Sequence, residues 1–398
     1  MRLDSVHINH FKSLSDITLD NLSPITLVIG ANAVGKSNLI DALRFLRDMV
    51  VEGLDHAISK RSGIITIRQY SPRKPFNITV KISFTDTVED GQSWHGYYEI
   101  TLASLTGGNY QIERESAKWS EEDLDFDEER QELVTLGLSE KYFSRDADGT
   151  LTIDDETAKL KLPKDQPALG SRSTWGKMAA PIADYISRFR FSSIFPNTLR
   201  EPSRPDTDRI LKETGENWAS TIKALKKTRP GKHALERIQE MMQVVMPTLQ
   251  DVSVRTVGAY LVPQFRVKDN SQSSAHDFDP VQISDGTLRI FGILLALYQN
   301  PAPPFIALEE PEQTVHPAIL SMLSEAFREV SERTQLLITS HSPYLVDFFS
   351  AEEIRIVSMQ NGKTRISPIK SSQIESVKEN LISLQDLMMA EGLMPEEP

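Results

Sequence analysis

The chain has 398 residues, of which 44 are basic and 56 acidic, so its formal net charge is −12. The length corresponds to two or three domains, and the apolar share of 39% is enough for a sizeable core. The longest apolar run, residues 290–298, is too short to cross a membrane, and the first residues lack the apolar core of a signal peptide. The absence of cysteine excludes disulfides and thiol chemistry. We expect a cytoplasmic protein, and the acidic balance argues against a general nucleic-acid coat.

The first fifty residues predict strands followed by a helix. Residues 3–8 and 17–19 predict short strands, and the β-branched run 25–29 predicts another. Apolar residues recur at helical spacing over 37–49. Gly30 follows the run 25–29 at once, so the predicted order is strand, glycine-containing loop and helix.

The next part of the chain predicts an antiparallel sheet, because short β-rich pieces alternate with turn clusters. The expected strands cover 64–67, 77–84, 96–102 and 109–112. The stretch 113–132 then holds ten acidic and three basic residues, which favours a solvated loop or helix face. A docking surface for a basic partner is the alternative.

The middle of the chain predicts helices and one basic stretch. Helices are expected at 175–189, 217–227 and 233–246, with an irregular segment at 196–205 and a break at Pro230-Gly231 between the last two helices. The stretch 223–237 has six basic residues and one acid, Glu236. It is the best candidate for contact with a phosphate backbone, and a plain solvated helical hairpin is the alternative.

The last third predicts an α/β arrangement. Apolar periodicity and turn residues give two helices, two buried strands and a closing hairpin around Asn361-Gly362. The expected elements are helices at 286–298 and 318–330, strands at 305–308 and 335–339, and hairpin strands at 354–358 and 364–366.

Residues Gly30 to Ser37, with the sequence GANAVGKS, fit the phosphate-loop pattern G-x-x-x-x-G-K-[ST] without a mismatch. The predicted strand before them and the helix after them argue against a chance match in a surface turn. Backbone N–H groups and the helix N-terminus form an anion cradle in such loops. Lys36 is expected to reach the β- and γ-phosphates, and the Ser37 hydroxyl to coordinate Mg²⁺.

A predicted buried strand, 305–308, ends in Glu309 and Glu310. A strand that delivers carboxylates at its end suits a Mg²⁺–nucleotide site, with Glu309 near the metal through water and Glu310 orienting or deprotonating the attacking water. An exposed acidic turn is the alternative. Because Lys36 lies 274 residues before Glu310, a large insertion must separate two halves of one site, which favours a split, two-lobed head.

Two further segments have residue types typical of phosphate sites. Ser284-Asp285-Gly286 opens the helix that starts near residue 288, so the serine is either an anion ligand or an ordinary N-cap. Thr339-Ser-His341-Ser-Pro343 ends a predicted buried strand, which places His341 near the γ-phosphate region.

The order of these motifs resembles ABC-type ATPase heads of the SMC, RecF and OLD (overcoming-lysogenization-defect) kind, and more narrowly the short AAA family ATPases of bacteria without a coiled coil. The similar blocks are 9–14, the phosphate loop, 198–202, 215–217, 284–289, 309–317 and 340–343. The resemblance implies an α/β P-loop NTPase fold of ABC type, two-lobed, with an antiparallel β subdomain and a helical insertion. The expected divisions are an ATPase lobe at 1–115, an acidic loop and helical insertion at 116–250, and a second lobe at 251–398.

The resemblance also implies residue roles. Ser284 and Gly286 correspond to the signature that acts across a dimer, Glu310 to the catalytic glutamate, His341 to the switch histidine, and 312–316 to the D-loop. Phe11 and Lys12 are expected near the nucleotide. The implied ATP contacts are Gly30, Asn32, Gly35, Lys36, Ser37, Asn38, Lys12, Ser284 and Gly286, with Ser37 and Glu309 at the metal.

The sequence departs from the pattern in three places. Asp285 stands where transporters have glycine, and Glu309 replaces the more usual aspartate, although both residues are familiar in OLD-like heads. The Q-loop glutamine is not evident, and Gln69 is a weak candidate.

The expected function is an ATP- and Mg²⁺-dependent head that forms a homodimer or higher homo-oligomer. The 57 residues after His341 are too few for the Toprim nuclease domain of OLD proteins, so a nuclease or toxin from a neighbouring gene is expected as partner, in anti-phage defence. The alternatives are a RecF-like ATPase that binds DNA and an ATP-gated scaffold with slow hydrolysis.

Overall fold

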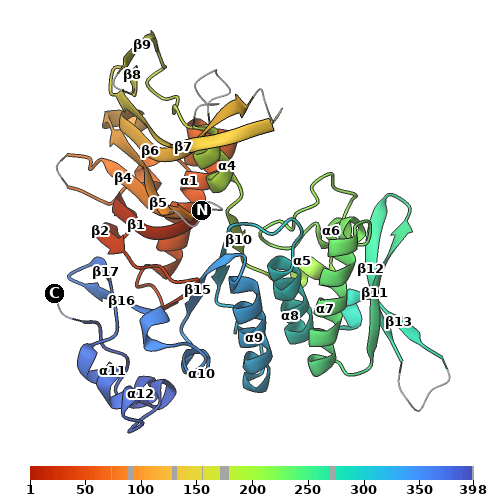
Figure 1. The fold of residues 1–398 in the computed structure, drawn as a ribbon. Coiled ribbons are helices and arrows are strands. Elements are labelled where there is room, and N and C mark those ends of the chain that lie inside the picture. Colours follow the sequence, from red (N-terminus) through yellow and green to blue (C-terminus); the bar gives the residue numbers. More distant parts are fainter. Residues whose placement is uncertain are drawn as a thin grey trace. The chain divides into compact units, whose positions relative to one another are not determined.

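The computed structural model (Figure 1) describes residues 1–72, 74–87, 93–127, 132–154, 156–170, 179–268 and 274–396. The chain forms two compact units, and neither is continuous in sequence. The first unit comprises Met1–Leu22, Asn32–Phe189 and Val357–Ile366, and the second comprises Ser23–Ala31, Arg190–Ile356 and Ser367–Pro398.

The first unit is built on an antiparallel sheet whose described strands run in the order β2-β1-β4-β5-β6-β7-β8-β9. Buried residues alternate along β5, from Trp94 to Leu102, as expected for a half-buried strand. The strands are β1 (Arg2–Phe11), β2 (Leu14–Leu19), β4 (Ile78–Thr87), β5 (Ser93–Ser104), β6 (Tyr110–Asp127), β7 (Glu132–Asp146), β8 (Thr150–Ile153) and β9 (Glu156–Lys161). The helices are α1 (Lys36–Glu52), α2 (Leu54–Ser59), α3 (Ile64–Ile67) and α4 (Ala180–Ser187).

Two helices cover this sheet. Phe45 of α1 packs against Phe11 of β1, and Tyr185 of α4 packs against Phe84 of β4. The ring centroids lie 5.9 Å and 5.8 Å apart. The first contact holds α1, which follows the phosphate loop directly, against the sheet, and the second holds α4.

Two predictions for the first unit are wrong. Residues 64–67 form the short helix α3 instead of a strand, because Gly63 opens a local turn and the i, i+3 pair Ile64 and Ile67 is buried on one side. Residues 113–127 continue β6 instead of forming a loop or helix face. Residues 128–131 lie outside the described residues, so the docking surface stays a prediction.

A buried carboxylate shows why part of the acidic stretch joins the sheet. Glu115 is fully buried and accepts hydrogen bonds from the Tyr98 hydroxyl (2.9 Å) and from the backbone N–H groups of Ala168 (2.7 Å) and Leu169 (2.9 Å). Burial raises the pKa of this carboxyl, while those hydrogen bonds and Arg145, its cross-strand partner, oppose the rise. The charge is therefore compensated inside the protein.

The second unit contains a mainly parallel sheet in the order β10-β14-β15-β3-β16, and β16 continues into a hairpin with β17. Every residue of β3 and β15 is buried, as is usual for parallel strands covered on both faces. Helix α9 contacts both strands. The strands are β3 (Ile25–Ile29), β10 (Arg190–Ser192), β14 (Phe305–Glu309), β15 (Gln335–Ser340) and the start of β16 (Ile354–Gln360). From Val357 on, β16 belongs to the first unit, as does most of β17 (Lys363–Ser367).

Helices and a small antiparallel sheet complete the second unit. The small sheet has the order β11-β12-β13. Its strands are β11 (Leu249–Val257), β12 (Tyr260–Val267) and β13 (His276–Phe278). The helices are α5 (Pro196–Arg200), α6 (Trp218–Leu225), α7 (Arg229–Val245), α8 (Asp285–Leu297), α9 (Leu320–Ser331), α10 (Pro343–Val346), α11 (Ser371–Lys378) and α12 (Leu384–Ala390).

The expected elements of the last third are confirmed, but two details of the middle are corrected. Pro230-Gly231 lies in the first turn of α7, where Thr228 caps the helix by accepting from Gly231 N (3.1 Å), so it starts a helix instead of breaking one. Residues 196–200 are the helix α5 and not irregular. Of the helix predicted at 175–189, residues 175–178 lie outside the described part.

Residues 115 and 250, where the sequence suggested divisions, lie within β6 and β11. Among the described residues, no helix is both long enough and apolar enough to span a bilayer.

Candidate functional site

Three parallel strands of the second unit end at one edge of its sheet. Glu309 of β14 pairs with Thr339 of β15, and Ser340 pairs with Ile29 of β3, so the three carboxyl ends are level. Ligands of open α/β sheets bind at this edge. The phosphate loop, the predicted carboxylates and the predicted switch histidine all start from it.

The phosphate loop leads from β3 into α1, and the division between the two units falls within it, after Ala31. Helix α1 begins at Lys36, which is buried, and no side chain caps its N-terminus. Its first turn contains no acidic residue. Asn32 and Ser37 are exposed. An uncapped helix start with exposed polar side chains is suited to an anion.

The backbone conformation at residue 35 and the close packing around it both require glycine there. Its φ of 110° is unfavourable for any residue with a side chain. A Cβ atom there would lie 2.4 Å from Thr364 Oγ1 and 2.9 Å from Ser13 Oγ. Thr364 Oγ1 also donates to the Val34 carbonyl (2.8 Å), so the β17 side chain supports the loop directly.

Two predicted ATP contacts are engaged with protein groups. Lys12 Nζ donates to Asp41 Oδ2 (2.6 Å), and Arg61 Nε donates to Asp41 Oδ1 (2.9 Å). Burial raises the pKa of Asp41, but Arg61 and Lys12 outweigh it and hold that pKa below its ordinary value. Asn38 Nδ2 donates to Ser13 Oγ (2.9 Å). Both side chains thus fasten α1 to the segment after β1.

Phe11, expected near the nucleotide, and Gln69, the weak candidate for the Q-loop glutamine, both have defined surroundings. Phe11 is fully buried in the core of the first unit. Gln69 Nε2 donates to Ser15 Oγ (2.5 Å), and its backbone N–H donates to the His10 carbonyl (2.8 Å).

Glu310 is held in a constrained position directly after β14. Its φ of 45° lies in the left-handed region, its N–H donates to the Thr339 carbonyl (2.9 Å), and its own carbonyl accepts from Arg289 Nη2 (3.0 Å). Gln313 Nε2 donates to one carboxylate oxygen, and His341 Nδ1 lies 3.4 Å from the other. Such strain persists where surrounding contacts fix it, and it is concentrated at functional sites.

Glu312 connects the turn after β14 to the end of β15. Its Oε1 accepts from Ser340 Oγ (2.5 Å) and from the backbone N–H of His341 (3.3 Å), and it lies 3.9 Å from His341 Nδ1. Its Oε2 is buried without a hydrogen bond among the described residues. The carboxylate therefore fixes the backbone that places His341 beside Glu310.

Arg289 is a buried cation in the part of helix α8 that is otherwise apolar, residues 288–297, and only 4% of its surface is exposed. Burial lowers the pKa of its guanidinium, and the nearby carboxylates of Glu312 and Glu310 oppose that shift. Sequence reasoning gave this residue no role. The available signal was a single charge in an apolar run, which requires a buried partner.

The predicted signature lies at the start of α8. Ser284 is the N-cap and accepts from Thr287 N (3.3 Å), and both Ser284 and Asp285 are exposed. A Cβ at Gly286 would lie 2.8 Å from the Thr314 carbonyl, so only glycine lets this turn approach the segment after β14 so closely. The structure thus brings the signature next to the predicted D-loop of the same chain.

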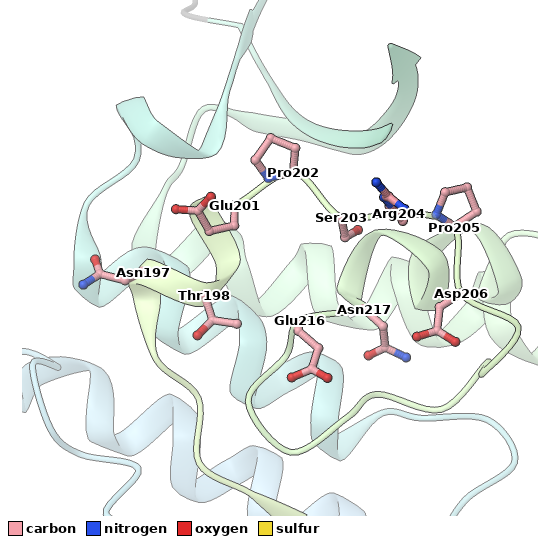
Figure 2. Close-up of a pocket in the computed structure, with 10 residues that line it drawn as sticks. All are labelled: Asn197, Thr198, Glu201, Pro202, Ser203, Arg204, Pro205, Asp206, Glu216 and Asn217. Carbon is pink, nitrogen blue, oxygen red and sulfur yellow. The ribbon is translucent and has the colours of Figure 1, made fainter. Parts of the chain in front are cut away.

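Two of the sequence blocks, 198–202 and 215–217, meet at a cavity of about 640 Å³. Figure 2 shows Pro202 to Pro205 along one side of the cavity and Glu216 and Asn217 on the other. The lining residues are Asn197, Thr198, Glu201, Pro202, Ser203, Arg204, Pro205, Asp206, Glu216 and Asn217.

The donor atoms present fit a nucleotide-bound Mg²⁺ ion. Within the described ranges, no group of three or more His, Asp or Glu side chains forms a metal site. In nucleotide sites Mg²⁺ needs only one or two protein oxygens, because phosphates and water supply the rest. The Ser37 hydroxyl and the Glu309 carboxylate are oxygen donors of the required kind.

The chain matches, over residues 25–347, the protein family described as "AAA domain, putative AbiEii toxin, Type IV TA system". It belongs to this family. The match contains the phosphate loop, the signature, both carboxylates and the switch histidine of the resemblance.

Two curated relatives are similar in sequence. The Old nuclease of Escherichia phage P2 is 23% identical over 414 aligned residues, which cover 91% of this chain and 60% of the nuclease. The DNA replication and repair protein RecF of Thermosynechococcus vestitus is 34% identical over 68 residues, 14% of this chain and 18% of RecF. The chain therefore spans less than two thirds of the length of these relatives.

Solved SMC heads share the fold. One, bound to the C-winged helix domain of ScpA, has a TM-score of 0.56 at 13% identity and covers 94% of this chain and 100% of its own. Another, with an extended coiled coil and the C-terminal domain of ScpA from Pyrococcus furiosus, has a TM-score of 0.54 at 12% identity, with 96% and 99% covered. Together these findings confirm an ABC-type P-loop ATPase head of the SMC, RecF and OLD kind.

Proposed function

We propose that the chain binds ATP with Mg²⁺, forms a homodimer around the nucleotides and hydrolyses them. The observation that supports this most strongly is the fixed position of Glu310 at the carboxyl edge of the sheet. Gln313 and His341 contact its carboxylate, and Arg289 contacts its carbonyl. The phosphate loop starts from β3 at the same edge.

Each residue has a role that its chemistry permits. Lys36 and the N–H groups of Gly30, Asn32, Gly35 and Asn38 hold the phosphates, while Ser37 and Glu309 hold the metal. Bound Mg²⁺ supplies charge neutralisation at the phosphates. Glu310 orients the attacking water and accepts its proton, and His341 fixes the glutamate and donates toward the γ-phosphate region. Lys12 supports α1 through Asp41.

The dimer follows from the proposed role of the signature. Ser284 is exposed at an N-terminus of α8, where its hydroxyl and the N–H of Gly286 are suited to an anion. We assign these groups to the γ-phosphate of the ATP bound by the other copy. A monomer then lacks a part of each site, so hydrolysis depends on protein concentration.

The test is Glu310→Gln, which retains the shape of the side chain but removes the base. We expect ATP-dependent dimers that persist on a sizing column and a hydrolysis rate about 10²–10³-fold lower. Glu325→Gln, on the exposed face of α9, is the matched control. A Glu310→Gln protein that stays monomeric with ATP and hydrolyses it normally contradicts the mechanism.

We further propose that the head drives or regulates a protein effector, a nuclease or toxin encoded nearby, in anti-phage defence. The similarity to a protein named as a nuclease supports this. Purification from the native operon with ATP, followed by nuclease treatment, is the experiment. A partner that remains bound after the treatment supports the effector, and a complex lost with the nucleic acid contradicts it.

A RecF-like function is the second candidate, because the α6–α7 turn exposes basic side chains. Lys223, Lys227, Arg229 and Lys232 are exposed and make no ion pair within the described residues, whereas Lys226 pairs with Asp251 (3.2 Å). DNA-stimulated ATPase that falls with salt and with Lys223→Glu/Lys227→Glu supports DNA binding. The paired Lys226 is the control position. Slow hydrolysis unaffected by DNA or by any partner supports the third candidate, an ATP-gated scaffold.

A further inference from the structure

Arg200, the last residue of α5, contacts the signature turn on both sides of Ser284. Its Nη2 donates to the Ile283 carbonyl (2.9 Å) and to Asp285 Oδ1 (2.5 Å). Its Nη1 donates to Asn197 Oδ1 within α5 (3.2 Å). One guanidinium thus connects α5 to the residues before and after the N-cap of α8.

Close packing gives Arg200 a rigid support. Leu199, the preceding residue, is fully buried. A Cβ at Gly215 would lie 2.7 Å from Leu199, and a Cβ at Gly292 of α8 would lie 3.0 Å from it. Both glycines therefore allow α5 to approach α8 and the 215–217 turn closely. The side of α5 that carries Asn197 and Thr198 lines the cavity of Figure 2.

This contact gives the aspartate of the predicted signature a cationic partner. An aspartate in the first turn of a helix interacts favourably with the helix dipole. Asp285 also places a negative charge beside the groups proposed to bind the γ-phosphate, where two anions repel each other. The Arg200 ion pair offsets that charge; the side chain of Arg200 is 22% exposed and that of Asp285 is 61% exposed.

We propose that Arg200 is a positioning residue for the signature. It neutralises Asp285 and holds Ser284 and Gly286 in the geometry that receives the phosphate of a second copy's ATP. This inference rests on the proposed function, since it requires that the signature acts in hydrolysis. It also gives a role to the block 198–202, which belongs to the resemblance but to which the sequence analysis assigned no function.

Steady-state kinetics with ATP tests the catalytic part. Arg200→Ala is expected to lower kcat about 10- to 100-fold, because small misplacements of binding groups cost rates of this order. The KM for ATP stays within about twofold of the wild-type value, since the phosphate loop is untouched. Glu201→Gln is the matched control: it removes a neighbouring charge that has no ion pair among the described residues, and its kcat stays at the wild-type value.

The double variant separates positioning from a merely structural role. Arg200→Ala leaves Asp285 uncompensated, so Arg200→Ala/Asp285→Ala is expected to be more active than Arg200→Ala alone. A double variant that is no more active, or an Arg200→Ala protein with wild-type kcat, overturns the proposal.

Hydrogen exchange without nucleotide distinguishes this proposal from the proposed function. Amides of residues 283–288 are expected to exchange faster in Arg200→Ala than in the wild type or Glu201→Gln, whether or not ATP is hydrolysed. If the wild-type protein hydrolyses ATP but these amides exchange equally fast in Arg200→Ala, the positioning role is refuted and the proposed function is not. A wild-type protein without ATPase activity refutes the proposed function and, with it, the catalytic role of the pair.

Discussion

The strongest prediction on stability concerns Gly35 and Thr364, which lie 329 residues apart in the sequence and meet at the phosphate loop. Gly35→Ala forces a side chain to adopt a φ of 110°, which costs about 1–3 kcal/mol. Its Cβ would also lie 2.4 Å from Thr364 Oγ1. The threonine must move and lose its hydrogen bond to Val34, at a further cost of about 1 kcal/mol. The sum is about 2–4 kcal/mol.

A double-mutant cycle on the free energy of unfolding, measured with urea, tests this reasoning. Thr364→Ala alone loses the same hydrogen bond and costs about 1 kcal/mol. Gly35→Ala/Thr364→Ala loses that bond only once and has no clash with the threonine hydroxyl, so it is expected to be at least about 1 kcal/mol more stable than the sum of the single effects predicts. Gly53→Ala is the control for strain without contact, because its φ is 96° and a Cβ there meets nothing within 4 Å. Additivity within about 0.5 kcal/mol refutes the proposed contact.

Three further predictions follow from the site. Glu312→Ala leaves the buried Ser340 hydroxyl and the His341 N–H without their acceptor, so the free energy of unfolding is expected to fall by about 1–3 kcal/mol, measured in urea against the exposed control Glu325→Ala. The pKa of Asp41 is lower in the folded chain than its ordinary value of 3.8, so its ion pairs stabilise the protein above about pH 4, and this contribution is lost as the pH falls further. Asp41→Asn is therefore expected to make the free energy of unfolding fall less steeply with decreasing pH in the acid range. An unchanged slope contradicts the pairing. Lys36→Ala is expected to abolish nucleotide binding in equilibrium dialysis while leaving thermal unfolding without nucleotide nearly unchanged, and retained binding contradicts the assignment of the loop.

The phosphate loop and the strand-end carboxylates could be predicted because their signals are local. A β-branched run, glycines at fixed spacing and an amphipathic helix lie within 25 residues of each other, and no distant contact is needed to recognise them. Glu310 and His341 were each expected at the phosphate site because both come directly after a predicted buried strand. The structure pairs these two strands in parallel, so both residues lie at one edge of the sheet.

Other features depend on contacts that no local pattern reveals. The stretch from residue 113 was expected to be solvated because it is acidic. Glu115 is instead buried, and its carboxylate accepts hydrogen bonds from Tyr98, 17 residues before it, and from backbone N–H groups more than 50 residues after it. Arg200 and Asp285 are 85 residues apart, and only the packing of α5 on α8 brings them together. Composition describes the average environment of a segment, whereas these positions are determined by single partners.

Helix α8 connects the two functional parts of the second unit. Its first turn is held by Arg200 and approaches the Thr314 carbonyl, and Arg289, one turn further along, donates to the carbonyl of Glu310. A buried guanidinium is costly, so its retention inside an apolar helix requires the carbonyl and the two neighbouring carboxylates. Helix α8 thus connects the predicted signature to the strained backbone of Glu310 through one helical turn and Arg289. In the proposed mechanism, a displacement of the signature turn by a second copy is expected to shift Glu310 as well.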